Sequence, residues 1–251
     1  LNIPLQPFYV NEKAVTEFRE TIMHRSSDKY VKWKDYYDYY IDKKYHGDEE
    51  ELLKFFNRVV EIGSKDNPFT LCDEEATRVS NGKVMNFLAT KTDLLFGGSA
   101  DLASSTKTYI NKGGDFTPDN YAGQNIWFGV REHAMGAILN GIAEAGYLPF
   151  GSTFLSFADY LKPAMRMTAL MNLPVTYIFT HDSINVGSDG PTHQPIEQIS
   201  MLRGIPNFMV YRPADFKETL GVWNAILTLQ GPSAIILSRK ETPSLEYTDP
   251  K

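Results

Sequence analysis

One segment of the sequence combines four side chains that could bind a ligand with residues that shape a loop. The segment THDSINVGSDGPTHQP, residues 180–195, directly follows the apolar run LPVTYIF and carries His181, Asp182, Asp189 and His193. Histidine and carboxylate side chains could together hold zinc or iron, or they could hydrogen-bond the hydroxyls of a polyol. The segment has no helical His-x-x-x-His pair and contains several glycines and prolines, which favours the second interpretation.

A glutamate lies at another junction between an apolar run and a helical segment. Glu132, in GVREHAMG, is expected to open a helix. An acidic residue in a first helical turn is favoured by the helix dipole alone, but a carboxylate at that place could also be a buried general acid or base. The neighbouring His133 could simply cap the helix or pack against it.

Two further sets of residues have both a structural and a functional interpretation. Phe154, Phe157 and Tyr160 follow one another at intervals of three, a helical spacing that is typical of core residues but would also suit a pocket for an aromatic ring. Arg78 and Arg239 are far apart in the chain. If they converged with Ser105 they would bind a phosphate, for which the guanidinium group is well suited, but the sequence alone does not show that they converge.

These residues must be positioned by alternating strands and helices. The strand candidates are short apolar runs at 93–100, 126–130, 147–153, 174–181, 207–213 and 233–239. Helical segments lie between or before them, at 74–91, 131–146, 154–171, 194–204 and 214–230. This alternation predicts an α/β fold with a mostly parallel sheet of about six strands and helices on both faces. Ligands bind beyond the carboxyl ends of such strands, where polar residues cluster here.

The first part of the chain differs in composition from the rest. It is rich in Lys, Tyr, Asp and Glu, and Tyr30, Trp33, Tyr37 and Tyr40 recur at helical spacing. We expect a solvated helical arm with one apolar face and no active-site chemistry.

Composition narrows the class of protein. The chain has 251 residues, 42% of them apolar and 22% charged, and a net charge of -6, which argues against a nucleic-acid partner. The single cysteine, Cys72, cannot form an internal disulfide and fits a cytoplasmic location. Neither a membrane-spanning run nor a signal peptide is evident. The first residue is leucine, so we expect a piece of a longer protein or a processed product.

Six motifs in order give a more specific indication. GGSADLASS, FGVREHAMGAILNGIA, GSTFLSFADY, THDSINVGSDGPTHQPIEQ, YRPAD and LSRKETP resemble the pyrimidine-binding domain of the transketolase family, and the similarity covers nearly the whole chain. The family moves a two-carbon ketol unit between sugar phosphates with thiamine diphosphate. The resemblance implies that Glu132 hydrogen-bonds the aminopyrimidine ring and promotes its imino form. It also implies that Phe154, Phe157 and Tyr160 surround that ring and that Asp101 lies near the cofactor at a homodimer contact.

The resemblance also implies roles in substrate binding. His181 and Asp189 match residues that contact the sugar, with Asp189 reading one hydroxyl configuration, and His193 matches a histidine near the reacting carbon and the cofactor. The groups around the substrate phosphate match Arg78, Ser105, His181 and Arg239. Substrates of the xylulose 5-phosphate and ribose 5-phosphate type are implied. Two residues of the loop depart from the family: Asn185 replaces a usual Gly, where its tolerance of positive φ would preserve the backbone, and Ser188 replaces a frequent Glu.

The family's Gly-Asp-Gly motif, which serves the diphosphate and a Mg²⁺ or Ca²⁺ ion, does not occur in this sequence. The resemblance therefore implies a half-site that is inactive alone, with no metal ligands of its own. It divides the chain into a linker and helical arm (1–68), a pyrimidine-binding domain (69–241) and a tail towards a third domain (242–251). Dihydroxyacetone synthase is a close alternative, and deoxyxylulose-phosphate synthase fits REHAMGA and the two-histidine loop less well. A non-catalytic dimerisation or binding module is the alternative outside the enzymes.

Overall fold

The computed structural model describes residues 8–60, 69 and 72–245 and centres on one parallel sheet. The sheet has six strands in the order β3-β2-β4-β5-β7-β6, and every neighbouring pair is parallel. In chain order the strands are β2 (Leu95–Ser99), β3 (Asn125–Trp127), β4 (Leu148–Phe154), β5 (Thr176–Thr180), β6 (Met209–Tyr211) and β7 (Ser233–Ile236). The strands β4, β5 and β7 are buried along their whole length, as expected for a sheet covered on both faces.

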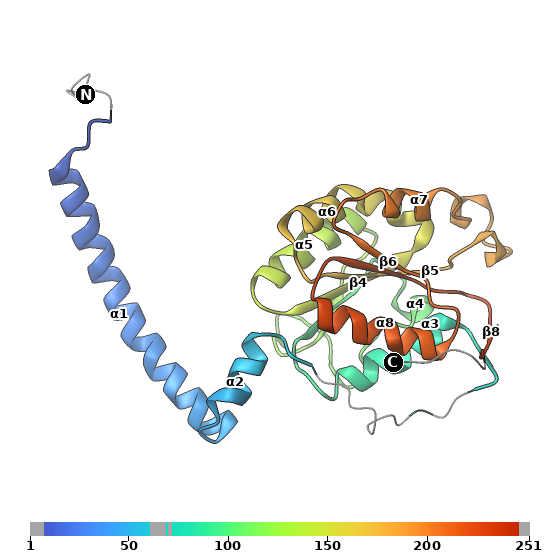
Figure 1. Ribbon diagram of the computed structural model, residues 1–251, viewed down its shortest axis with the longest axis horizontal. Helices are drawn as coiled ribbons and strands as arrows, with labels where there is room; N and C mark the ends of the chain where they lie inside the picture. The colour runs from blue at the N-terminus through green and yellow to red at the C-terminus, as the bar shows by residue number, and fades with distance from the viewer. Residues whose placement is uncertain (1–7, 61–68, 70–71, 246–251) are drawn as a thin grey trace. The chain divides into compact units, whose positions relative to one another are not determined.

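Helices cover both faces of this sheet (Figure 1). On one face lie α5 (Glu132–Glu144), α6 (Ala158–Met171) and α7 (Gln198–Arg203), and on the other α3 (Thr77–Leu88) and α8 (Phe216–Leu229). A short helix, α4 (Ala103–Thr106), follows β2. The predicted α/β class, the six strands and the helices between them are therefore confirmed.

The core forms where α5 and α6 pack on β4 and β5. Met135 and Leu139 of α5 are fully buried, whereas Ile138 on the same helix is 48% exposed. A Cβ atom at Gly136 would lie 2.7 Å from the Cβ of Ala164, so glycine lets α5 approach α6 closely. The apolar periodicity of this segment thus predicted the helix correctly, although not all of its apolar residues face the core.

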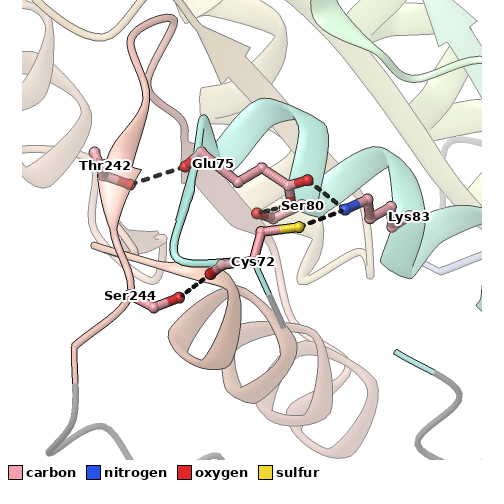
Figure 2. Close-up of polar contacts among 6 residues, drawn as sticks. All are labelled: Cys72, Glu75, Ser80, Lys83, Thr242 and Ser244. Atoms are coloured by element: carbon pink, nitrogen blue, oxygen red, sulfur yellow. Dashed lines mark hydrogen bonds and ion pairs between the residues drawn. The ribbon is translucent and has the colours of Figure 1, made fainter. Parts of the chain in front are cut away.

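A two-stranded antiparallel ladder joins distant parts of the chain. Strand β1 (Glu74–Glu75) pairs with β8 (Thr242–Pro243). Figure 2 shows that Thr242 and Ser244 donate side-chain hydrogen bonds to the carbonyls of Glu75 (3.1 Å) and Cys72 (2.8 Å). The carboxylate of Glu75 in turn accepts a hydrogen bond from Ser80 (2.8 Å) and pairs with Lys83, both on α3. The segment before α3 is thereby attached to the segment after β7.

The chain divides into two compact units, residues 1–55 and 56–251. The first contains α1 (Glu12–Tyr45), whose N-cap residue Asn11 accepts a hydrogen bond from the Ala14 amide. The next helix along the chain is α2 (Glu49–Phe56). The predicted helical arm is present, and the side chains of Tyr30 and Trp33 are more than half exposed. None of the helices in the described ranges is long and apolar enough to cross a membrane.

Candidate active site

Residues from five parts of the chain line one cavity at the carboxyl ends of the strands. Its volume is about 450 Å³. The lining side chains are those of Arg78, Ser105, Phe154, His181, Asp189, His193 and Arg239. They come from the start of α3, from α4, from the end of β4, and from the segments that follow β5 and β7. The structure thus brings Arg78 and Arg239, which the sequence could not place together, to the same cavity.

The pairing of β4 with β5 explains how two of these residues meet. Phe154 is the register partner of Thr180, the last residue of β5. The next residue, His181, stacks on the Phe154 ring with a centroid distance of 3.6 Å, and its Nδ1 atom is 2.9 Å from the Thr180 hydroxyl. His181 has a positive φ of 61°, an uncommon backbone conformation for a residue other than glycine. This turn ends the strand and directs the imidazole along the cavity wall.

Burial and neighbouring charge make His181 a neutral side chain. Burial is the largest cause that lowers its pKa, followed by the positive charges of Arg78 and Arg239, and the value falls from 6.5 to about 4. Asp189 opposes this shift, because a negative charge favours the protonated ring. At neutral pH the imidazole therefore offers one donor and one acceptor and carries no charge.

The two arginines give the cavity its positive charge. Nη1 of Arg78 donates to the Ser105 carbonyl and Nη1 of Arg239 donates to the Val186 carbonyl, each at 2.6 Å. The pKa of Arg78 is lowered by burial first and by Arg239 second, so the two guanidinium groups repel each other. The buried Nε of Arg78 has no hydrogen-bond partner in the described part of the chain. Two such cations with remaining donors favour an anionic ligand.

Glu132 is buried but does not line this cavity. It is the first residue of α5 and only 8% exposed, and its Oε1 accepts a hydrogen bond from the Thr153 hydroxyl at 3.3 Å. Glu132 therefore both begins a helix and is buried, so a role in favouring the helix start and a role as a buried acid or base are compatible. Thr153, on β4, is a contact that the sequence analysis did not identify. The sequence signal for this contact was the position of Thr153 in STF, at the end of a predicted strand.

The three aromatic residues do not lie on one helix, contrary to the expected spacing. Phe154 ends β4, Phe157 lies in the 3-10 turn η2 (Leu155–Phe157), and Tyr160 is on α6. The Phe154 and Phe157 rings are nearly parallel, with centroids 6.1 Å apart, and Phe157 also contacts the His193 ring at 5.2 Å. The Tyr160 side chain is 64% exposed. Strand β4 extends to Phe154 because its last residues still pair with β5.

The other residues that the sequence singled out do not line the cavity. Asp101, after β2, is exposed and has a φ of 76°. Asp182 does not line the cavity, and its carboxylate accepts a hydrogen bond from Arg212 at 2.7 Å. Asn185 lies in the 3-10 turn η3 (Ile184–Val186) and is not among the residues with positive φ, so the expectation that it would replace glycine in that conformation is wrong. Ser188 is exposed.

The described residues contain no group of three or more His, Cys, Asp or Glu side chains that could hold a metal ion. What they do contain is a parallel α/β sheet with a cationic cavity, a buried carboxylate and an aromatic edge at the carboxyl ends of its strands. This combination defines an α/β domain whose cavity lies where open α/β sheets bind their ligands, and the charge of that cavity suits an anion.

Comparison with known proteins gives the family. The family model described as "Transketolase, pyrimidine binding domain" matches residues 73–244. Curated transketolase from Geobacillus stearothermophilus is 46% identical over 97% of this chain and 37% of its own length. The solved transketolase from Leishmania mexicana superposes with a TM-score of 0.91 at 35% identity, over 98% of this chain and 37% of that one. A Pichia stipitis transketolase in complex with sedoheptulose-7-phosphate gives 0.84 at 34% identity, over 98% and 38%.

The chain therefore belongs to the transketolase family and contains its pyrimidine-binding domain. It spans about 37% of the length of the first of these relatives.

Proposed function

We propose that this chain supplies the pyrimidine-binding and sugar-phosphate-binding part of a transketolase active site. The complete enzyme would move a two-carbon ketol unit from a ketose phosphate to an aldose phosphate. The observation that carries this proposal is the cavity in which Arg78, Arg239, His181 and Asp189 converge. It combines two cations for a phosphate with a neutral imidazole and a carboxylate for hydroxyl groups.

The residues beside the cavity fit the pyrimidine ring of thiamine diphosphate. Glu132 is a buried carboxylate whose one described partner is a neutral hydroxyl, so it could share a proton with a ring nitrogen. Phe154 and Phe157 offer parallel aromatic faces, and Tyr160 is exposed at the same edge. When bound, the cofactor supplies the stabilised carbanion chemistry that side chains cannot provide. The chain's own part is to orient the ring, hold the proton at Glu132 and keep water from it.

The substrate would extend from this edge into the cavity. Arg78 and Arg239, with Ser105, would bind its phosphate. His181 would contact the sugar and its phosphate, and His193 would lie near the reacting carbon and the cofactor. Asp189 would accept a hydrogen bond from a hydroxyl of one configuration. The relative solved with sedoheptulose-7-phosphate supports a sugar phosphate as ligand, and substrates of the xylulose 5-phosphate and ribose 5-phosphate type fit a cavity of this size and charge.

Further parts of the proposal come from the family. The enzyme would act in the cytoplasm, in the pentose phosphate pathway, as a homodimer whose sites lie at the subunit interface. Its Mg²⁺ or Ca²⁺ would be held by residues outside this chain. Asp101 would lie near the cofactor at the dimer contact, where its exposed position leaves the carboxylate accessible.

Two substitutions in the complete enzyme test the substrate assignment. Arg239→Ala should lower kcat/KM for phosphorylated ketoses by about tenfold to about 150-fold, the scale of a lost hydrogen bond to a charged group, and leave free ketoses nearly unchanged. Asp189→Ala should affect ketoses of the natural configuration most and narrow the preference over the other configuration. The measurement is steady-state kinetics on phosphorylated and free ketoses of both configurations.

Arg203→Ala is the matched control, because Arg203 is an exposed arginine at the end of α7, away from the cavity. If Arg239→Ala slows phosphorylated and free ketoses by the same factor, Arg239 serves mainly to hold the Val186 carbonyl and the phosphate assignment is wrong. Absence of any turnover by the complete wild-type protein would favour the non-catalytic binding module.

A further inference from the structure

The backbones that carry the two cavity arginines are joined by a reciprocal pair of side chains. Thr77 precedes Arg78 and Ser238 precedes Arg239. The Thr77 amide donates to the Ser238 hydroxyl at 3.0 Å, and the Ser238 amide donates to the Thr77 hydroxyl at 2.7 Å. The two hydroxyls are themselves 3.1 Å apart. Three hydrogen bonds thus connect residues that are 161 positions apart in the sequence.

We propose that Thr77 and Ser238 are positioning residues that set the separation of Arg78 and Arg239 for phosphate binding. The inference rests on the proposed function, since it assigns the pair a role in the same cavity. Neither hydroxyl lines the cavity, so each acts only through the arginine that follows it.

Electrostatics explains why such a connection is needed. The guanidinium groups of Arg78 and Arg239 repel each other, which is one cause of the lowered pKa of Arg78. Without a connection, the start of α3 and the end of β7 could move apart and relieve this repulsion. An anion would then have to draw the arginines back together on binding, which weakens affinity.

The surroundings limit movement at this junction. Thr77 is fully buried and begins α3, which packs against α8. The β1–β8 ladder in Figure 2 joins the same two segments, with β1 just before Thr77 and β8 just after Arg239. That ladder consists of two-residue strands, each with one exposed and one half-buried residue, whereas the Thr77–Ser238 contact lies next to the arginines. The pair is therefore the connection that most directly controls the arginine separation.

The test is a series of substitutions in the complete enzyme. Thr77→Val keeps the shape of the side chain and removes the acceptor for the Ser238 amide. We expect it to raise KM for a phosphorylated ketose by about threefold to tenfold, the scale of one net hydrogen bond. The kcat value and the KM for the free ketose should stay within about twofold, because the positioned arginines do not contact the reacting carbon. Thr77→Ser should restore the wild-type KM, since it retains the hydroxyl.

Thr219→Val is the matched control. Thr219 is a fully buried threonine of α8 whose hydroxyl donates to the Asp215 carbonyl at 2.7 Å, away from the cavity. The Thr219→Val variant should lose stability as Thr77→Val does, but its KM values for the phosphorylated and the free ketose should be unchanged. The Thr77→Val effect should also shrink when Arg78 and Arg239 are both replaced by alanine, because it acts through them.

The outcomes separate this inference from the proposed function. If the arginine substitutions themselves do not distinguish phosphorylated from free ketoses, the proposed function fails. If they do, but Thr77→Val changes the two KM values equally or changes only thermal stability, the positioning role is overturned. Failure of Thr77→Ser to restore the KM would also contradict it.

Discussion

The neutral state of His181 gives a stability effect that can be measured on this chain alone. The His181 pKa is about 4 in the folded chain, against an ordinary value of 6.5. Between these values the unfolded chain binds a proton that the folded chain does not, so stability falls as the pH falls. Lowering the pH from 7 to 5 should remove about 2 kcal/mol through this one residue, and lowering it to 4 about 3 kcal/mol. The loss levels off below about pH 3, where His181 is protonated in both states.

That loss is large beside the total stability of a domain, about 5–15 kcal/mol. It can be isolated by comparing wild type with His181→Gln, which is neutral at every pH. Urea unfolding at pH 7, 6 and 5 should show wild-type stability falling by about 2 kcal/mol more than that of the variant over this range. Because other titrating groups are common to both proteins, the difference reports the His181 contribution.

Nuclear magnetic resonance provides an independent check on the same residue. The ring proton signals of His181 should remain those of a neutral imidazole down to about pH 5. Adding inorganic phosphate should raise the His181 pKa if the anion binds between the arginines, because a nearby negative charge favours the protonated ring. A midpoint near 6.5 for His181, or parallel losses of stability in wild type and His181→Gln, would refute this account of the site.

Two other predictions concern catalysis and packing. In the complete enzyme, Glu132→Gln should keep the fold and reduce turnover by at least ~10²-fold, because the amide cannot hold the proton at the cofactor ring; activity within a few-fold of wild type would make Glu132 only a helix-start residue. In the present chain, Gly136→Ala should lower the free energy of unfolding by about 1–3 kcal/mol, because its Cβ would overlap Ala164 and Leu161. The control Gly141→Ala, on the same helix but with no atom within 4 Å of its Cβ, should instead stabilise by about 0.4–1 kcal/mol, and equal effects would show that close packing is not the cause.

The sequence predicted the fold well because the relevant signals are local. The buried strands are short apolar runs, and helical spacing of apolar residues marks helices such as α5, with Met135 and Leu139. The polar residues after the strands also indicated where side chains from several strands would meet, and the structure has a shared cavity at that edge of the sheet. These inferences need only the neighbours of a residue and the general rule for parallel sheets.

Other features of the site depend on contacts between distant residues. The convergence of Arg78 and Arg239 follows from the packing of α3 beside the end of β7, which no local pattern encodes. The stacking of His181 on Phe154 depends on the register between β4 and β5. The extension of β4 to Phe154 likewise depends on its pairing with β5. Family resemblance, rather than spacing, was what grouped these residues beforehand.

The way the cavity is built bears on how it would bind its ligand. Both arginines donate hydrogen bonds to backbone carbonyls, and their backbones are joined by Thr77 and Ser238. His181, which lines the same cavity, is kept neutral. The repulsion between the guanidinium groups is therefore already present in the folded chain. We expect an entering phosphate to offset this repulsion without having to reorganise the site. If the proposed positioning role is right, the site should prefer an anion, because a neutral sugar of the same shape would leave the repulsion in place.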